Sequence, residues 1–166
     1  MSMDVSAPEV RPETVGGLRQ LFRYGVVGLA STGVQAAVFY ILAATWLQCL
    51  TPEDPAVRFL GLPSVTLGDG LRAVRAAAAT AVGFTLANVF CWVMNRLFVF
   101  RAGRHKWYVE FMLFYGAAAG ATIIALGLQS VFIKYFGMWT TLALGIEVVA
   151  SFVINFFVRK FFIFKG

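Results

Sequence analysis

The sequence has few of the residues that build enzyme active sites, metal sites or disulfide frameworks. Its 166 residues include one histidine, His105, and two cysteines, Cys49 and Cys91, both at or inside apolar runs. Two such cysteines give no disulfide framework, and no ordinary set of metal ligands can be assembled. Paired carboxylates and nucleophile–base sets are missing as well. The sequence therefore predicts a protein that is not an enzyme and needs no metal or cofactor.

Charged residues are also scarce, at 13%, whereas hydrophobic residues make up 60% of the chain. A soluble domain of this length cannot bury so much apolar surface, so the bilayer is the natural place for it. The net charge of +6 comes from basic residues in short groups beside apolar runs. Such groups are typical of membrane-flanking charge, which argues against nucleic-acid binding.

Four apolar runs are each long enough to span a bilayer as a helix. They lie at about 24–47, 76–98, 109–133 and 140–162, with a long loop at 48–75 and a short link at 134–139. Residues 1–17 are predicted to be a flexible tail and 18–23 a short interfacial helix. We expect an all-α integral membrane protein whose single membrane domain covers residues 18–166.

The basic residues also predict the orientation of the four spans. Ten lie in the tail, the loop after the second span and the C-terminus: Arg11, Arg19, Arg23, Arg96, Arg101, Arg104, Lys106, Arg159, Lys160 and Lys165. Four lie on the other side: Arg58, Arg72, Arg75 and Lys134. The more basic side is expected to be cytoplasmic, together with both termini. Cys49 should then react with an impermeant thiol reagent from outside intact cells.

The two halves of the sequence are similar to each other. NRLFVF at Asn95–Phe100 matches RKFFIF at Arg159–Phe164, and Arg23-Tyr-Gly25 matches Phe114-Tyr-Gly116. Each half would hold two spans and enter from the same side. This predicts two parallel two-helix repeats about an axis along the membrane normal. The alternative is that basic and aromatic residues simply mark the ends of any membrane helix.

Several of these segments resemble the GtrA-like family of small four-span membrane proteins. They are FRYG at Phe22–Gly25, NRLFVF at Asn95–Phe100, and Asn155-Phe156 before FFIF at Phe161–Phe164. The second span departs from the family pattern, with Cys91-Trp92 where an Asn-Phe pair is usual. The resemblance implies translocation of a polyprenyl-phosphate-linked monosaccharide from the cytoplasmic to the outer leaflet of a bacterial inner membrane. It also implies a membrane glycosyltransferase as partner, which loads the lipid carrier.

Polar residues within the spans indicate where such a substrate could pass. Glu147 lies about 10 Å into the fourth span at 1.5 Å per residue, and a charge there costs up to about 3 kcal/mol on insertion scales. Ser151 and Asn155 follow on the same helical face. This stripe is either a hydrogen-bonded seam between helices or a face toward the sugar. Asn88, Asn95, Gln35 and Gln129 are the other candidates for the sugar path.

Four cations at the cytoplasmic ends of the spans are candidates for binding a lipid phosphate: Arg23, Arg96, Arg159 and Lys160. Ordinary positive-inside anchoring is the alternative for each of them. The motif Gly116-Ala-Ala-Ala-Gly120 predicts a close helix contact within the subunit. Four helices can hardly enclose a sugar path and shield it from lipid, so we also expect a homo-oligomer.

A lipid-linked sugar flippase is thus the leading interpretation. A scaffold that recruits a glycosyltransferase without transport is the alternative, and it would depend on the basic loop Arg101–Lys106. A four-span exporter of small cations is less favoured, because such exporters usually rely on a carboxylate in the first span, and this chain has none there.

Overall fold

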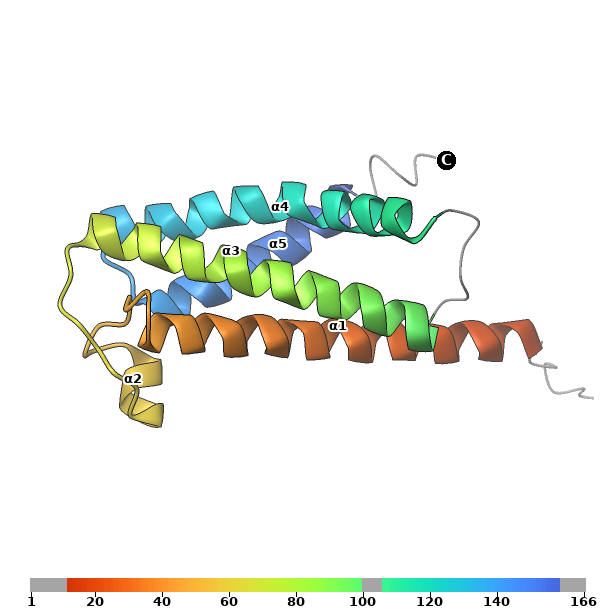
Figure 1. The fold of residues 1–166 in the computed structure, drawn as a ribbon, viewed down its shortest axis with the longest axis horizontal. Helices are drawn as coiled ribbons and strands as arrows, with labels where there is room; N and C mark the ends of the chain where they lie inside the picture. The colour runs from red at the N-terminus through yellow and green to blue at the C-terminus, as the bar shows by residue number, and fades with distance from the viewer. Residues whose placement is uncertain (1–11, 100–105, 159–166) are drawn as a thin grey trace, which may run out of the picture.

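The computed structural model describes residues 12–99 and 106–158, which form four long helices and two short ones (Figure 1). In chain order these are α1 (Pro12–Ala44), α2 (Pro55–Leu60), α3 (Asp69–Met94), η1 (Asn95–Val99), α4 (Trp107–Phe136) and α5 (Thr140–Val158). The π-helix η1 directly continues α3. There is no strand in the described ranges, so the prediction of an all-α chain is confirmed there.

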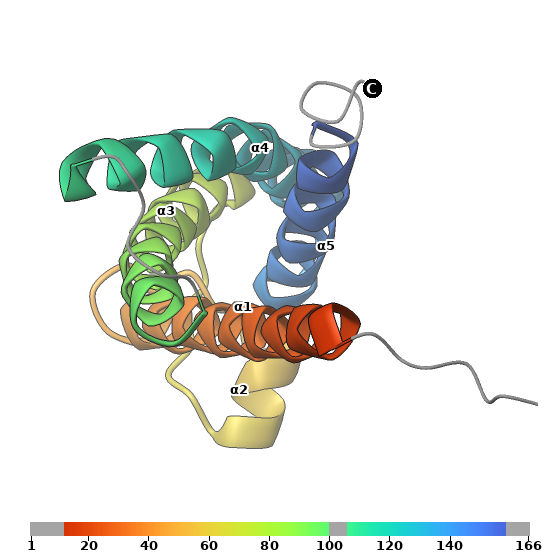
Figure 2. The same cartoon turned by 90° about the vertical axis from the view of Figure 1, so that its right-hand side faces the viewer.

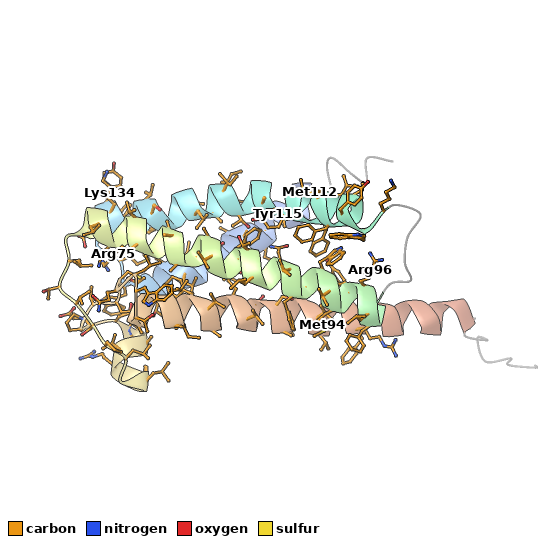
Figure 3. All side chains as sticks on the ribbon, viewed as in Figure 1. Arg75, Met94, Arg96, Met112, Tyr115 and Lys134 are labelled. Carbon is orange, nitrogen blue, oxygen red and sulfur yellow. The ribbon has the colours of Figure 1, made fainter. Side chains whose placement is uncertain are left out.

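The four long helices form one bundle, and α2 lies outside it beside α1 (Figures 1 and 2). We call the end of the bundle with α2 and the short α4–α5 link the loop end. The opposite end, where η1 lies, is the η1 end. Lys134 and Arg75 lie at the loop end, and Arg96 lies toward the η1 end (Figure 3).

Three helical stretches are long and apolar enough to cross a membrane: Phe22–Ala44, Asp69–Phe98 and Trp107–Phe136. A shorter apolar stretch covers Thr140–Ile154 in α5. Large apolar side chains such as Leu29, Ile123 and Phe152 are exposed on the outside of the bundle, as lipid-facing residues would be. The end of the predicted fourth span, 159–162, lies outside the described residues.

The largest differences from the predicted helix boundaries are at the starts of α1 and α3. α1 begins at Pro12, inside the segment 1–17 that was predicted as a tail, and runs without a break through 18–23. α3 begins at Asp69, seven residues earlier than the predicted start of the second span at 76. Because Arg72 and Arg75 are charged, the sequence predicts a loop at these residues. The structure has a helix there, and Asp69 in its first turn favours a helix start. Residues 1–11 of the predicted tail lie outside the described residues.

The loop end is closed by an apolar core and by hydrogen bonds between the long loop and the helices. Phe39, Ala76, Ile133 and Leu144 bring α1, α3, α4 and α5 together there. The Thr140 hydroxyl donates to the Cys49 carbonyl at 2.6 Å, and the Arg72 guanidinium donates to the Met138 carbonyl at 2.9 Å. Arg72 also forms an ion pair with Asp69 at 2.6 Å. The segment predicted as an open loop is therefore packed onto the bundle.

Cys49 is fully buried in this packing, which contradicts the expected reaction with an impermeant reagent. Burial, together with the nearby negative charge of Asp54, raises the pKa of the Cys49 thiol to about 12. The thiolate is the reactive form, so reaction at neutral pH is slow even where the reagent has access. A sequence pattern could not show this, because the burial depends on the contact between the loop and α5.

The close helix contact in the bundle is made by Gly83 and not by the Gly116–Gly120 motif. A Cβ atom at Gly83 would lie 2.9 Å from the Gln35 backbone oxygen, so α3 and α1 approach each other at this level. At Gly116 and Gly120 a Cβ atom would meet no atom of the described residues within 4 Å. The close contact predicted at Gly116–Gly120 is therefore not found among the described residues.

Candidate functional site

The buried polar groups of the bundle centre on Glu147 of α5. This side chain is fully buried, and one of its carboxylate oxygens accepts a hydrogen bond from the Gln35 amide of α1 at 3.0 Å. The other carboxylate oxygen has no hydrogen-bond partner among the described residues. About one and a half helical turns from Gln35 and Glu147, toward the loop end, the Tyr40 hydroxyl donates to the Thr141 hydroxyl at 3.1 Å. This is a second hydrogen bond between α1 and α5.

Gln129 of α4 and Thr80 of α3 are the other buried polar side chains near this level. Both are fully buried. The amide oxygen and nitrogen of Gln129 and the hydroxyl of Thr80 have no hydrogen-bond partner among the described residues. Each of the four long helices thus contributes one of these groups. We call Gln35, Thr80, Gln129 and Glu147 the four-helix polar cluster.

The chain geometry places these four residues at a similar depth. Gln129 lies seven residues before the end of α4, and Glu147 lies seven residues after the start of α5. At 1.5 Å per residue, both are about 10 Å from the short link that joins the two helices. Gln35 contacts Glu147 directly, and Gly83 contacts Gln35 one helical turn from Thr80. The cluster therefore crosses the bundle at one level, next to the apolar core.

A second candidate site lies at the η1 end, in a pocket between α1 and η1. Its volume is about 450 Å³, and its lining residues are Phe22, Arg23, Val26, Val27, Leu97 and Phe98. We call it the η1 pocket. Among the described residues that line it, Arg23 alone is charged, and its guanidinium donates to the Phe98 carbonyl at 3.3 Å. An apolar pocket with one cation suits an amphiphile that carries an anionic group.

Two further predicted residues lie close to this pocket, on η1 itself. Asn95 is buried; its amide donates to the Cys91 sulfur at 3.3 Å, and its oxygen has no partner among the described residues. The guanidinium of Arg96 lies over the Trp92 ring, 5.5 Å from its centre, and Arg96 lies toward the η1 end of the bundle (Figure 3). π-Helical turns recur at functional sites, and this one carries two predicted site residues.

The remaining predicted residues are not brought together with either site. The Asn88 amide donates to the Phe84 carbonyl and the Ser151 hydroxyl to the Val148 carbonyl, each within its own helix. Ser151 is half-buried. The side chain of Asn155 and the whole of Arg159 and Lys160 lie outside the described residues. The polar stripe from Glu147 to Asn155 is therefore described only in its first half.

Sequence reasoning missed Thr80, Gly83 and Asp54. A threonine in an alanine-rich helix carries no signal of its own, and only the contact with Gln35 distinguishes Gly83 from the other glycines. Asp54 could have been found in part, since aspartate before a proline at the first helical position is a capping pattern. Its side chain does cap α2, by accepting from the Ala56 amide at 3.0 Å. Its contact with Thr141 could not be foreseen.

The comparison with protein families gives one match. The family model described as the GtrA/DPMS transmembrane domain matches residues 23–164. No curated protein and no solved structure matches the chain. The matched range includes all of the four-helix polar cluster and all of the η1 pocket except Phe22.

Proposed function

Because the chain belongs to the GtrA/DPMS transmembrane domain family, we propose that it moves a polyprenyl-phosphate-linked monosaccharide from the cytoplasmic to the outer leaflet of a bacterial inner membrane. Membership of the family fits a role in handling lipid-linked sugars. The proposal adds the direction of movement and the carrier. A membrane glycosyltransferase would load the carrier on the cytoplasmic side, and the sugar would be used outside.

The observation that carries the proposal is the η1 pocket. Of the six described residues that line it, five are apolar and the sixth is Arg23. A polyprenyl phosphate has the same two parts, a branched hydrocarbon chain and an anionic head. Arginine binds phosphate oxygens through charge-assisted, often bidentate hydrogen bonds. The apolar part of the pocket would hold the first isoprene units while Arg23 holds the phosphate.

The proposed topology places the η1 end in the cytoplasm, as the basic residues predict. The chain would then cross the membrane four times, as two parallel two-helix repeats, with the loop end outside. The closed core at the loop end means that the sugar would enter from the η1 end and reach the four-helix polar cluster. Passage to the outside would require the contacts between the long loop and α5 to open. A homo-oligomer would shield this route from lipid.

Replacing Arg23 by glutamine tests the role of the η1 pocket. We expect transport to fall about tenfold, because a hydrogen bond to a charged group contributes roughly 1.5 kcal/mol or more. The measurement uses proteoliposomes that contain a polyprenyl-phosphate monosaccharide with a fluorescent label on the sugar. A membrane-impermeant reductant then quenches the label in the outer leaflet. Labelled lipid from the inner leaflet is quenched only after it has crossed, so the rate of this slower quenching measures movement between leaflets.

The matched control is Arg58→Gln, which removes the same charge from exposed α2 at the loop end. It should transport at the rate of the unmodified protein, and Arg23→Lys should recover part of the loss. Equal rates for Arg23→Gln and Arg58→Gln would exclude a phosphate site at Arg23. No protein-dependent movement of any lipid-linked sugar would favour the scaffold that recruits a glycosyltransferase.

The proposed orientation is tested by cysteine labelling at Ser64, an exposed residue of the long loop. An impermeant maleimide should label Ser64→Cys on intact cells, whereas the unmodified chain should stay unlabelled because Cys49 is buried and its raised pKa keeps it protonated at neutral pH. If Ser64→Cys is labelled only after lysis, the loop end faces the cytoplasm and the proposed topology is wrong.

A further inference from the structure

The four-helix polar cluster contains more hydrogen-bonding groups than its own members satisfy. One oxygen of Glu147, the hydroxyl of Thr80 and both amide atoms of Gln129 are buried without a partner among the described residues. Leaving one such polar group unpaired in an apolar surrounding costs about 1–3 kcal/mol, and more for a charged group. Natural interiors keep few unpaired groups, so four unpaired atoms on three neighbouring helices indicate that the cluster has a further partner.

The chemistry of these atoms indicates what that partner is. A carboxylate, two amide carbonyls and a hydroxyl are hard oxygen ligands, which bind hard cations. The cluster offers one negative charge and, in the described ranges, no basic side chain beside it. We propose that the four-helix polar cluster binds one monovalent cation at Glu147, either Na⁺ or a proton.

The charge balance supports a single positive charge. Glu147 forms no ion pair with a described residue, and its one hydrogen-bond partner, Gln35, is neutral. The members contributed by α3 and α4, Thr80 and Gln129, are neutral as well. One monovalent cation makes the cluster neutral, whereas a divalent ion would leave a net charge in the apolar interior. A neutral cluster avoids the cost of an isolated buried charge.

Other titratable groups on the described helices lie toward the two ends of the bundle. Arg23, Cys91, Arg96 and Tyr115 lie on the η1 side of the cluster, and a second set lies toward the loop end. Thr141, which marks that level on α5, is six residues from Glu147, or about 9 Å along the helix. The groups toward the loop end include Tyr40 on α1, Cys49 and Asp54 in the long loop, Asp69, Arg72 and Arg75 on α3, and Lys134 on α4. The Asp54 carboxylate accepts a hydrogen bond from the Thr141 amide, and Asp69 forms an ion pair with Arg72. The charge state of Glu147 is therefore set mainly by its occupant.

The position of the cluster gives the cation a structural effect. Gln35 and Glu147 join α1 to α5, two helices whose further link, Tyr40 to Thr141, lies at the loop end. A Na⁺ ion held by oxygens from all four helices would tie them together at one level, whereas a proton on Glu147 would let its carboxyl group donate one hydrogen bond. After release of the cation, the negative and partly negative oxygens of the cluster would repel each other. This repulsion would loosen the bundle at that level. The proposal concerns binding alone and does not depend on which molecule the protein transports.

Binding is tested on the full chain in lipid nanodiscs, with no lipid-linked sugar present. For Na⁺, NaCl is titrated against choline chloride at constant ionic strength, and the melting temperature is followed. At Na⁺ one hundredfold above the Kd, we expect a rise of about 5 °C, because ligand bound to the native state alone stabilises it. For a proton, infrared spectra should show a protonated carboxylic acid band that disappears at alkaline pH and is absent from Glu147→Gln.

The variants separate the cluster from its surroundings. Glu147→Gln should abolish both signals. Gln129→Leu and Thr80→Val should weaken the affinity for Na⁺ at least tenfold in the melting titration, or shift the carboxylic acid band. The matched control is Ser31→Ala on α1, whose buried hydroxyl donates to the Val27 carbonyl of its own helix at 2.7 Å. It should keep the full response. If the unmodified protein shows neither a Na⁺-specific rise nor a protonated carboxyl group from mildly acidic to mildly alkaline pH, the proposal is wrong, whatever the transport assay finds.

Discussion

Replacing Asp54 by alanine should lower the free energy of unfolding by about 4 kcal/mol, because a buried carboxylate that accepts three hydrogen bonds is lost. Asp54 is fully buried. One of its oxygens accepts from the Ala56 amide at 3.0 Å and from the Thr141 hydroxyl. The other accepts from the Thr141 amide at 2.9 Å. A hydrogen bond to a charged group contributes about 1.5–3 kcal/mol, and three that share one carboxylate do not add fully.

The size of this effect comes from the double role of Asp54. Its carboxylate caps the first turn of α2 and also binds the first turn of α5, at residues far apart in the sequence. Amide groups at the start of a helix lack partners within the helix, and a negative charge there is favourable. Alanine would leave the Ala56 and Thr141 amides unpaired in a buried place. The long loop should then detach from α5, and Cys49 should become reactive.

The measurement is denaturant titration in detergent micelles, with thiol labelling of Cys49 as a second readout. Glu53→Ala is the matched control, because Glu53 is the exposed neighbour and the same charge is removed. It should change the stability by less than about 0.5 kcal/mol, as surface substitutions usually do. Asp54→Asn should fall between the two. Equal stability of the Asp54→Ala and Glu53→Ala proteins would show that the loop end is not held by this carboxylate.

Replacing Gly83 by alanine should destabilise the bundle by about 2 kcal/mol, the usual cost of adding atoms to a closely packed contact. The new Cβ atom would lie 2.9 Å from the backbone oxygen of Gln35 and 3.5 Å from its Cγ atom. A backbone oxygen cannot rotate away, so α3 and α1 must separate. That movement would also displace the Gln35 amide from Glu147. The substitution should thus weaken both the packing and the four-helix polar cluster.

Gly127→Ala on α4 is the matched control, because a Cβ atom there meets nothing within 4 Å. Alanine is the better helix former, so this variant should be as stable as the unmodified protein or slightly more stable. Thermal unfolding of both variants in the same nanodiscs gives the comparison. A Gly83→Ala protein as stable as Gly127→Ala would mean that α1 and α3 do not approach at Gln35.

Much of the fold could be predicted from the sequence, because membrane helices are recognised by length and apolar content alone. The third predicted span, 109–133, lies inside α4, and the short link before Thr140 places α4 and α5 as an antiparallel pair. The start of α3 at Asp69 was missed because Arg72 and Arg75 lower the apolar content of its first turns. The structure shows where those charges go, with Arg72 bound to Asp69 and to the Met138 carbonyl.

The candidate site could be predicted only in part. The sequence predicts Gln35, Gln129 and Glu147 as site residues, because polar side chains within membrane spans are energetically costly and usually mark functional sites. The structure confirms that Glu147 faces the bundle interior and not the outside. It does not group Asn88 with these residues, because the Asn88 amide is bound within its own helix. The η1 pocket is lined partly by residues of the FRYG and NRLFVF segments, but no sequence pattern shows that these two segments meet.

The sequence by itself determined that the chain is helical and suited to a bilayer, because those properties depend on local composition summed over about 20 residues. Only the tertiary structure decided which polar groups meet. Gln35 and Glu147 are 112 positions apart, and Asp54 and Thr141 are 87 positions apart. Contacts at such separation depend on the rotation and crossing of whole helices, and these follow from side-chain packing at every level of the bundle.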